Sequence, residues 1–302
     1  MKWWMVIAIF IQWEINLISA QEIILMPCTL TKDSFIIDST AYLLSSFNPN
    51  DITTTPSFLG DNSFLVSANF PDSNQVDIWK LDLADSTVSS ISATTVSEYA
   101  PQPDYFTPHR ILFIRKNGAN DSKLWFYPVS QQNQGNALFD FPTDLSIIDF
   151  KQLNNNEIGL LIQDTIELHS TSPHTYKIII FNSTAQNSFT LTNKVLPMIQ
   201  SLDGNLYFIH QIISSTKYLK VRTPGSKRSL IITTIPFDIN AICPIDENNF
   251  LAVSHTLIYY FSKKDKSGWL PLIDLHYLGL KAIHSLQYKD NKLLIEGQFR
   301  QR

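Results

Sequence analysis

The sequence has little glycine, and it lacks both a basic stripe and any long apolar run after its first twenty residues. Nine glycines among 302 residues, together with 12% aromatic residues, exclude a collagen-like or low-complexity chain. Lysine and arginine are scattered, with no more than two in a row, and the formal net charge is −4, so the sequence shows no basic stripe to release counterions from a nucleic acid. Because no later stretch reaches 18 consecutive apolar residues, we expect no membrane span in the mature chain.

Cysteine is also scarce. The chain has two cysteines, Cys28 and Cys243, and two are too few to form a disulfide framework. Each lies within an apolar, strand-like run, where a buried free thiol is the commoner state. The pattern favours free thiols and leaves a single bridge between them open.

The short motifs of common catalytic sites are missing. The sequence contains no glycine-rich phosphate loop, no His-Glu-x-x-His, no Cys-x-x-Cys and no Gly-x-Ser-x-Gly. Seven histidines are scattered singly; His210 and His255 end the same strand of two repeats, 45 residues apart, but no third ligand type lies nearby. We therefore assign no catalytic residue, metal ligand or cofactor, and keep Ca²⁺ open as one candidate ion.

The first twenty residues have the layout of a secretory signal peptide. Lys2 precedes a mostly apolar run that ends at Trp13, and the small residues Ser19 and Ala20 stand before Gln21. A membrane anchor is the alternative, but about 11 apolar residues are too few to cross a hydrocarbon core of about 30 Å. We predict cleavage near Ala20 and a secreted or periplasmic protein, with 21–302 forming one domain.

The rest of the chain is a repeat of short strands and polar turns. A partly apolar strand, a turn and a strongly apolar strand return six times, as in "PDYFTPHRILFIR" and "IQSLDGNLYFIHQ". The strongly apolar strands are centred at intervals of 47, 48, 47, 44 and 43 residues, on Leu65, Leu112, Leu160, Tyr207, Leu251 and Leu294. This period is that of a four-stranded propeller blade. We expect Asp61-Asn62, Asp203-Gly204 and Asp290-Asn291 to adopt positive φ in these turns.

The two ends of the chain predict a closed ring. The sixth hairpin has no third and fourth strands of its own, whereas segments 22–30 and 35–46 are strand-like and unpaired. Pairing them would complete a sixth blade and leave no long open edge. The predicted fold is all-β, a six-bladed propeller of four-stranded antiparallel blades, with five or seven blades as alternatives. Trp79 and Trp125 occupy equivalent third strands, where packing between blades is favoured over ligand stacking.

One stretch resembles a known repeat. "SEYAPQPDYFTPHRILFIRKNGANDSKLWFYPV" is similar to the repeat of the TolB-like propeller family, in which a Ser-Pro-Asp-Gly-Lys-like turn precedes an apolar strand and an Asp-Ile-Tyr or Leu-Trp strand follows. Here "TPHRI", "SLDGNL" and "GDNSFL" occupy the turn, and "DIWKLDL" and "KLWFYPV" the later strand. The resemblance is clearest over 53–129 and implies an exported bacterial six-bladed propeller. The sequence shows no additional domain of the kind that precedes the propeller of the translocation protein itself, which argues against a role in the Tol system.

The candidate site lies where the connections between blades meet the channel. Four of these connections each carry one acid, and Tyr99 adjoins one of them. The predicted ligand-binding residues are Asp51, Glu98, Tyr99, Asp144 and Asp238. Such loops on a rigid scaffold are common binding sites. The alternative is that each acid accepts hydrogen bonds within its own loop.

These patterns favour a binding function over catalysis. The leading hypothesis is an exported, monomeric, non-catalytic propeller that binds another envelope or secreted protein or a small ligand. The alternative is a channel-mouth hydrolase or lyase that acts on a saccharide or lactone, with the acids holding a divalent ion. A degenerate propeller with a purely structural role is a third hypothesis.

Overall fold

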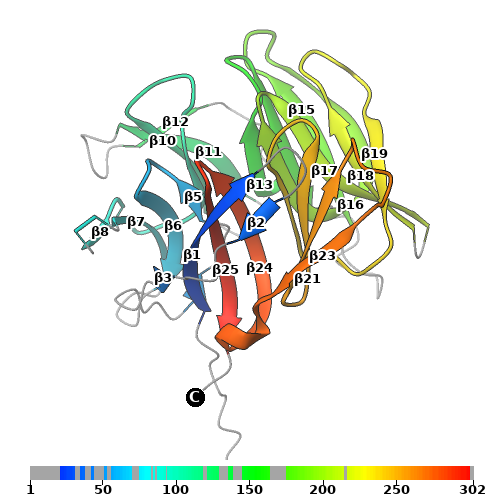
Figure 1. Cartoon of the computed structure of the whole chain (residues 1–302). Coiled ribbons are helices and arrows are strands. Elements are labelled where there is room, and N and C mark those ends of the chain that lie inside the picture. Colours follow the sequence, from blue (N-terminus) through cyan, green and yellow to red (C-terminus); the bar gives the residue numbers. More distant parts are fainter. Residues whose placement is uncertain are drawn as a thin grey trace, which may run out of the picture.

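The computed structural model shows an antiparallel β-propeller (Figure 1). The residues it describes are 21–30, 35–37, 42–43, 51–52, 56–69, 75–82, 84–85, 87–92, 94–117, 121–128, 135–138, 145–163, 175–213 and 216–299. The predicted signal peptide, residues 1–20, lies outside them. Within these ranges no helix is long and apolar enough to cross a membrane.

The first two blades follow the predicted order of strands. The first consists of β4 (Asp51–Ile52) and β5 (Ser57–Phe58), which both pair with β6 (Ser63–Asn69), and then β7 (Val76–Asp82) and β8 (Thr87–Ser90). The second consists of β9 (Ser97–Pro103), β10 (Arg110–Lys116), β11 (Ser122–Pro128) and β12 (Asn136–Ala137). The short outer strands β8 and β12 contain exposed residues, because only one neighbouring strand covers each of them.

The third and fourth blades share one long strand. The third uses β13 (Ser146–Gln152), β14 (Glu157–Gln163) and β15 (Tyr176–Asn182), and the fourth uses β17 (Asn205–Ile213), β18 (Thr216–Arg222) and β19 (Leu230–Ile235). Between them β16 (Asn187–Leu202) pairs first with β15 and then with β17, with a register shift between Val195 and Ile199. The seven-stranded sheet is therefore two blades joined through β16.

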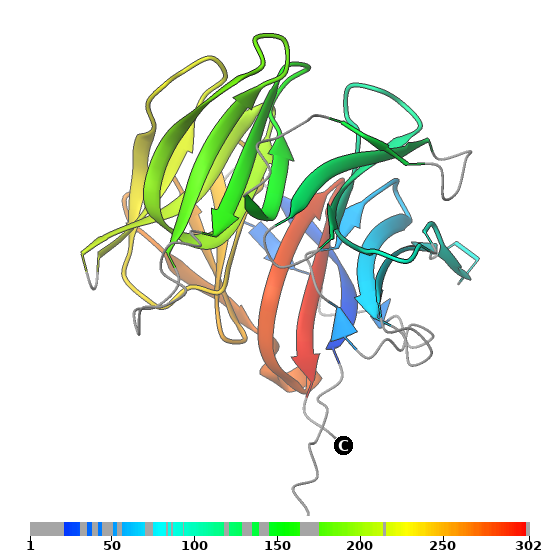
Figure 2. The same ribbon diagram turned by 180° about the vertical axis from the view of Figure 1, so that it is seen from behind.

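The fifth blade is regular and the sixth closes the ring. The fifth consists of β20 (Ala241–Pro244), β21 (Asn249–Ser254), β22 (Leu257–Ser262) and β23 (Leu270–Asp274), followed by the 3₁₀ helix η2 (Leu275–Leu278). The sixth combines β24 (Leu280–Lys289) and β25 (Lys292–Phe299) with β1 (Gln21–Leu30), β2 (Phe35–Ile37) and β3 (Tyr42–Leu43). Figures 1 and 2 show blue β1 beside red β25; the two pair from Gln21↔Gln298 to Pro27↔Lys292. This confirms the predicted closure and the six blades.

The inner turns agree with the sequence in two of three cases. Asp203, Gly204, Asp290 and Asn291 all have positive φ, as predicted. Gly204 is required there, because a Cβ would lie 2.5 Å from the backbone oxygen of Leu153. The prediction for Asp61-Asn62 was wrong: neither residue has positive φ, and the backbone N–H groups of Leu59 and Gly60 instead donate to the oxygen of Ser63.

Six apolar clusters form the core, one between each pair of neighbouring blades. Between the first and second blades, for example, Leu65 and Ile78 pack with Ile111 and Phe113. Trp79 packs on the cluster between the sixth and first blades and Trp125 on the next one, which confirms their predicted role between blades. The core thus lies in the seams between the sheets and not at the ring's centre.

Both cysteines lie in the seam between the fifth and sixth blades. Cys28 and Cys243 are buried, free and part of the same apolar cluster, as the sequence favoured. Burial raises the pKa of each thiol to about 12, so both are protonated at neutral pH.

We predict that Met26→Asp opens the ring. Met26 of β1 is completely buried in the same seam, so the substitution would place an unpaired carboxylate among apolar side chains and lower the free energy of unfolding by about 4 kcal/mol or more. Ile36→Asp is the matched control, because Ile36 on β2 is 56% exposed. Urea unfolding followed by tryptophan fluorescence would compare the two. Equal midpoints would show that β1 does not hold the ring closed.

Candidate functional site

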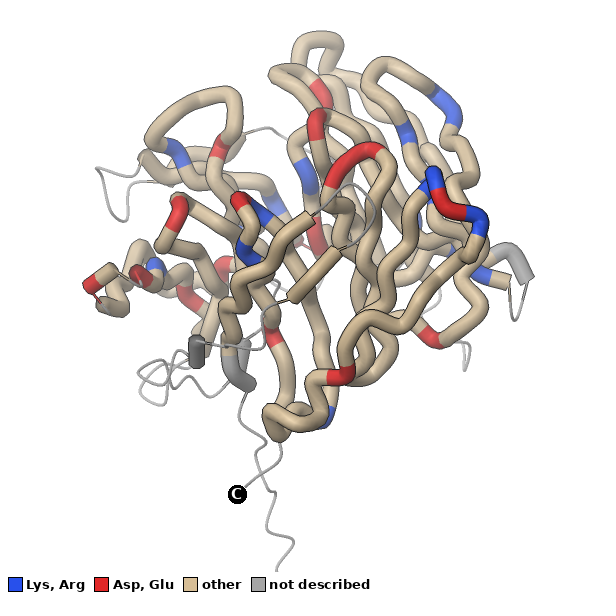
Figure 3. The backbone as a smooth tube through the Cα atoms, in the orientation of Figure 1, with Lys and Arg blue, Asp and Glu red and all other residues tan. Residues whose placement is uncertain are grey.

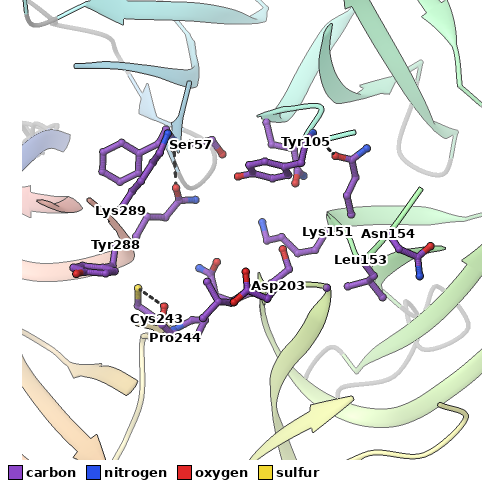
Figure 4. Close-up of a pocket in the computed structure, with 18 of the residues that line it drawn as sticks. Ser57, Tyr105, Lys151, Leu153, Asn154, Asp203, Cys243, Pro244, Tyr288 and Lys289 are labelled. Atoms are coloured by element: carbon purple, nitrogen blue, oxygen red, sulfur yellow. Dashed lines mark hydrogen bonds between the residues drawn. The ribbon is translucent and has the colours of Figure 1, made fainter. Parts of the chain in front are cut away.

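A cavity of about 620 Å³ opens at one end of the central channel, where the first strands of the blades run into their inner hairpin turns (Figure 4). Every blade contributes to its wall. The contributions include Ser57, Gln102, Gln152, Gln200, Cys243 and Gln287, one from each blade in order. Its size falls within the range of small-molecule sites in proteins.

Glutamine amides form part of the polar wall. Gln102 Nε2 donates to the backbone oxygen of Phe150 at 2.8 Å, and Gln200 Nε2 donates to that of Leu286 at 3.4 Å. Gln287 Oε1 accepts from the backbone N–H of Phe58 at 3.4 Å. Each bond joins two different blades, so it orients the side chain and ties the channel together.

The charged groups of the cavity are partly neutralised. Lys151 is largely buried and forms an ion pair with Asp149, Nζ to Oδ2, at 3.1 Å. Burial raises the pKa of the Asp149 carboxyl, although the charge of Lys151 acts to lower it. The other charged residues of the described wall are Lys289, which is half-buried, and Asp203, which is exposed.

The turn of the second blade projects two aromatic rings at the cavity mouth. Tyr105 is 65% exposed and Phe106 43% exposed, and both line the cavity. The buried Asp104 carboxylate holds this turn: Oδ1 accepts from the backbone N–H groups of Phe106 and Thr107 at 3.0 Å each, and Oδ2 forms an ion pair with Arg110. Burial alone would raise the pKa of Asp104, but hydrogen bonds from Gln152 and Arg110 bring it below its ordinary value.

Two further polar braces join blades at this end. Arg222 is fully buried and makes two hydrogen bonds to Glu157, Nη1 to Oε2 at 3.0 Å and Nη2 to Oε1 at 2.9 Å, which connect the fourth and third blades. Lys292 of the sixth blade donates to the backbone oxygen of Asp61 at 2.6 Å and to Asn62 Oδ1 at 2.8 Å in the first. The cavity therefore lies beside contacts that join neighbouring blades.

Among the five residues predicted to bind a ligand, Glu98 lies in a buried ion pair. Its carboxylate is completely buried, and Oε1 accepts from Arg115 Nη2 and from the Tyr127 hydroxyl, both at 2.7 Å. Arg115 also stacks on the Trp125 ring at 3.9 Å. Burial and, less strongly, the charge of Glu98 raise the pKa of nearby Asp77. Glu98 is thus enclosed by protein groups and does not open onto the channel.

The other predicted residues are dispersed. Tyr99 is half-buried against the seam between the second and third blades, with Lys116 Nζ 4.8 Å from its ring centre. The Asp238 side chain is 86% exposed and pairs with Lys217 at 2.6 Å, and this contact lowers its pKa. Asp51 begins β4, but its side chain is not described, and Asp144 lies outside the described residues. Their binding role stays a prediction.

Glu98 and the cavity lie toward opposite ends of the channel. Glu98 is near the start of β9 and Gln102 near its end, followed directly by the turn that carries Tyr105. The sequence did predict the centres of the strongly apolar strands, and five of these six centres pair, across the neighbouring strand, with residues that line the cavity. The paired residues are Ser57, Gln102, Gln200, Cys243 and Gln287. The sequence therefore held a signal for most of this wall: in five blades the residue opposite the centre of the apolar strand lines the cavity, whereas Leu160 pairs with Phe150, which does not.

No cluster of three or more histidine, cysteine, aspartate or glutamate side chains suited to a metal ion occurs in the described ranges. His210 is half-buried, and burial, then Lys220 and Lys194, lower its pKa. His255 adopts a positive φ at the end of its strand.

Comparisons with known proteins show which solved structures share this fold. No family model matches the chain, and no curated protein matches it by sequence. A solved structure assigned as TolB from Agrobacterium tumefaciens is 11% identical with a TM-score of 0.62, covering 94% of this chain and 99% of that one. The chain has the fold of the TolB propellers. TolB from Acinetobacter baumannii is 11% identical with a TM-score of 0.52, and the match covers 92% of this chain but only 64% of that one.

The same architecture matches a protein of a different kind. A chain in the crystal structure of a nidogen/laminin complex is 10% identical with a TM-score of 0.57, covering 88% of this chain and 97% of that one. Because propellers of this shape carry many functions, the likeness establishes the fold and the function must come from the site.

We predict that two of the acids proposed from the sequence differ in their contribution to stability. Glu98→Ala should lower the free energy of unfolding by about 3 kcal/mol, because it leaves Arg115 without its buried partner. Asp238→Ala should leave the unfolding midpoint unchanged, because an exposed pair contributes little. Chemical denaturation of both variants at pH 7 is the measurement, and equal effects would contradict the burial assigned to Glu98.

Proposed function

We propose that this chain is an exported, non-catalytic propeller that binds a ligand or partner in the cavity at the hairpin end of its channel. The observation that carries the proposal is the wall itself, to which all six blades contribute and in which polar side chains are fixed by bonds between blades. Groups held in place before binding lose little conformational entropy when a ligand arrives. Rigid, concave and mixed in polarity, the wall suits recognition.

The polar groups of the cavity favour binding over chemistry. Four of its lining residues are glutamines, whose amides donate and accept hydrogen bonds but do not titrate near neutral pH. Acids elsewhere in the fold, such as Glu98 and Glu157, are engaged by Arg115 and Arg222.

Export and the class of partner belong to the same proposal. The layout of residues 1–20 favours a cleaved signal peptide and a periplasmic or extracellular location, as does the similarity in fold to TolB structures. We propose that the mature chain works as a monomer and that its partner is a secreted or envelope protein or a small ligand. Figure 3 shows acidic and basic positions interspersed along the described backbone, and with a net charge of −4 this pattern does not favour a nucleic-acid partner.

We predict that Tyr105→Ala abolishes capture while Tyr277→Ala does not. Tyr105 lines the cavity mouth, whereas Tyr277, which is 55% exposed, lies in η2 at the connection between blades, so the two variants remove the same kind of side chain from opposite ends. The wild-type protein and both variants would be immobilised, exposed to an extract of the producing cells and analysed by mass spectrometry. Molecules retained by wild type and Tyr277→Ala but lost by Tyr105→Ala support the proposal; equal retention by all three overturns it.

A hydrolase or lyase that acts on a saccharide or lactone is the second candidate. The observation in its favour is Asp149, whose carboxyl pKa is raised by burial beside Lys151, a residue of the cavity wall. Carboxyl groups tuned in this way can act in proton transfer. Of the four acids that the sequence suggested for a divalent ion, Glu98 is enclosed by Arg115 and Tyr127, so in this version Asp51, Asp144 and Asp238 would serve the ion.

We predict that 1 mM CaCl₂ leaves the melting temperature unchanged. A native-state site with a dissociation constant of about 10 µM would stabilise the protein by about 2.7 kcal/mol at this concentration and raise the midpoint by about 5 °C or more. Differential scanning calorimetry with CaCl₂ and with EDTA makes the comparison. A rise of that size would favour the enzyme over the binding protein.

A further inference from the structure

We infer that the ligand of the cavity is a neutral saccharide, whose ring stacks on Tyr105, the more exposed of the two aromatic residues, and whose hydroxyl groups bond to the glutamine amides. This inference rests on the proposed binding function and adds the chemical class of the ligand. Three independent properties of the cavity lead to it: exposed aromatic rings on a fixed turn, amide ends without partners, and balanced charge.

The aromatic rings are exposed on a turn that cannot easily bury them. Asp104 anchors the turn from beneath through four groups, and Gln152 Oε1 accepts from the backbone N–H of Tyr105 at 3.0 Å. Exposing two large aromatic rings to water is unfavourable. The turn nevertheless keeps them exposed, because hydrogen bonds to the next blade and an ion pair fix its backbone. A turn held this way presents flat apolar faces beside a polar cavity. Pyranose rings have such an apolar face, formed by their axial C–H groups.

The amide groups have capacity for hydroxyl groups. The bonds described above occupy Nε2 of Gln102 and Gln200 and Oε1 of Gln287. The opposite ends, two carbonyl oxygens and one NH₂ group, make no hydrogen bond to any described residue, and none of them is sealed from the cavity. The wall therefore offers both acceptors and donors. Each hydroxyl of a sugar both donates and accepts, so a mixed wall of this kind suits it.

The charge of the cavity selects against anionic ligands. Lys151 is paired with Asp149, and Lys289 shares the wall with Asp203, so the two lysines are balanced by two carboxylates. No arginine lines the described wall, although arginine is the side chain best suited to bind carboxylate or phosphate by two parallel bonds. Of the two lysines in the described wall, Lys151 is already engaged by Asp149, so a uronate or sugar phosphate could pair with Lys289 alone and would meet the Asp203 carboxylate in the same wall. The neutral sugar is the class that the wall can satisfy.

Titration of the purified protein with oligosaccharides tests the inference. The probes are a panel of neutral trisaccharides (maltotriose, cellotriose and N,N′,N″-triacetylchitotriose), with trigalacturonate as the anionic counterpart, measured by isothermal calorimetry and by ligand-detected NMR up to about 10 mM. We expect at least one neutral sugar to bind and trigalacturonate not to bind. Tyr105→Ala and Gln200→Leu should each weaken the neutral ligand about tenfold, which corresponds to about 1.4 kcal/mol, and Tyr277→Ala should not change it.

Three results would overturn the inference. They are failure of every neutral sugar to bind, equal or tighter binding of trigalacturonate, and neutral-sugar binding that Tyr105→Ala leaves intact. Capture from cell extract separates these failures from that of the proposed function. If molecules are still retained in a Tyr105-dependent way while no sugar binds, the binding function stands and only the ligand class is wrong.

Discussion

Each blade of this protein has two apolar faces, and only a neighbouring blade can cover them. The six apolar clusters lie in the six seams, so every sheet is held from both sides and a missing contact anywhere would leave one face open to water. The ring can close only because β1 pairs along β25 and supplies Ile24, Met26 and Cys28 to the last seam. The closing strand is therefore part of the core.

Packing in the seams also determines which side chains face the central channel. Apolar side chains point sideways into the seams, and the first strands turn polar groups toward the axis, where they need partners. Bonds such as Gln102 to Phe150 and Gln152 to Asp104 meet this need across blade boundaries. The same bonds that satisfy buried polar groups fix the cavity wall, so stability and binding geometry depend on one set of contacts.

The fold could be read from the sequence because its signal is repeated, whereas the site is set by side-chain partners that are distant in sequence. Strand centres from Leu65 to Leu294 recur at a nearly constant interval, and closure followed from strands left over at the two ends. Glu98 looked like a channel-mouth acid, yet its partners Arg115 and Tyr127 enclose it. The strand register places Glu98 directly opposite Arg115. This register could not be derived from the sequence, because it depends on the length of the hairpin turn, which differs between blades.

The two ends of the channel use their acids in the same way, and this explains why the cavity depends on amides. At one end Glu98 pairs with Arg115 and Asp238 with Lys217. At the other, Asp104 and Glu157 pair with Arg110 and Arg222 to hold turns and join blades. A carboxylate that is bonded to a turn or to a neighbouring blade is not available to a ligand, because binding the ligand would break the bonds that hold the turn. Gln152 is bonded at both ends of its amide, but Gln102, Gln200 and Gln287 are each bonded at one end, so these three can hold the wall together and still offer an atom to a ligand.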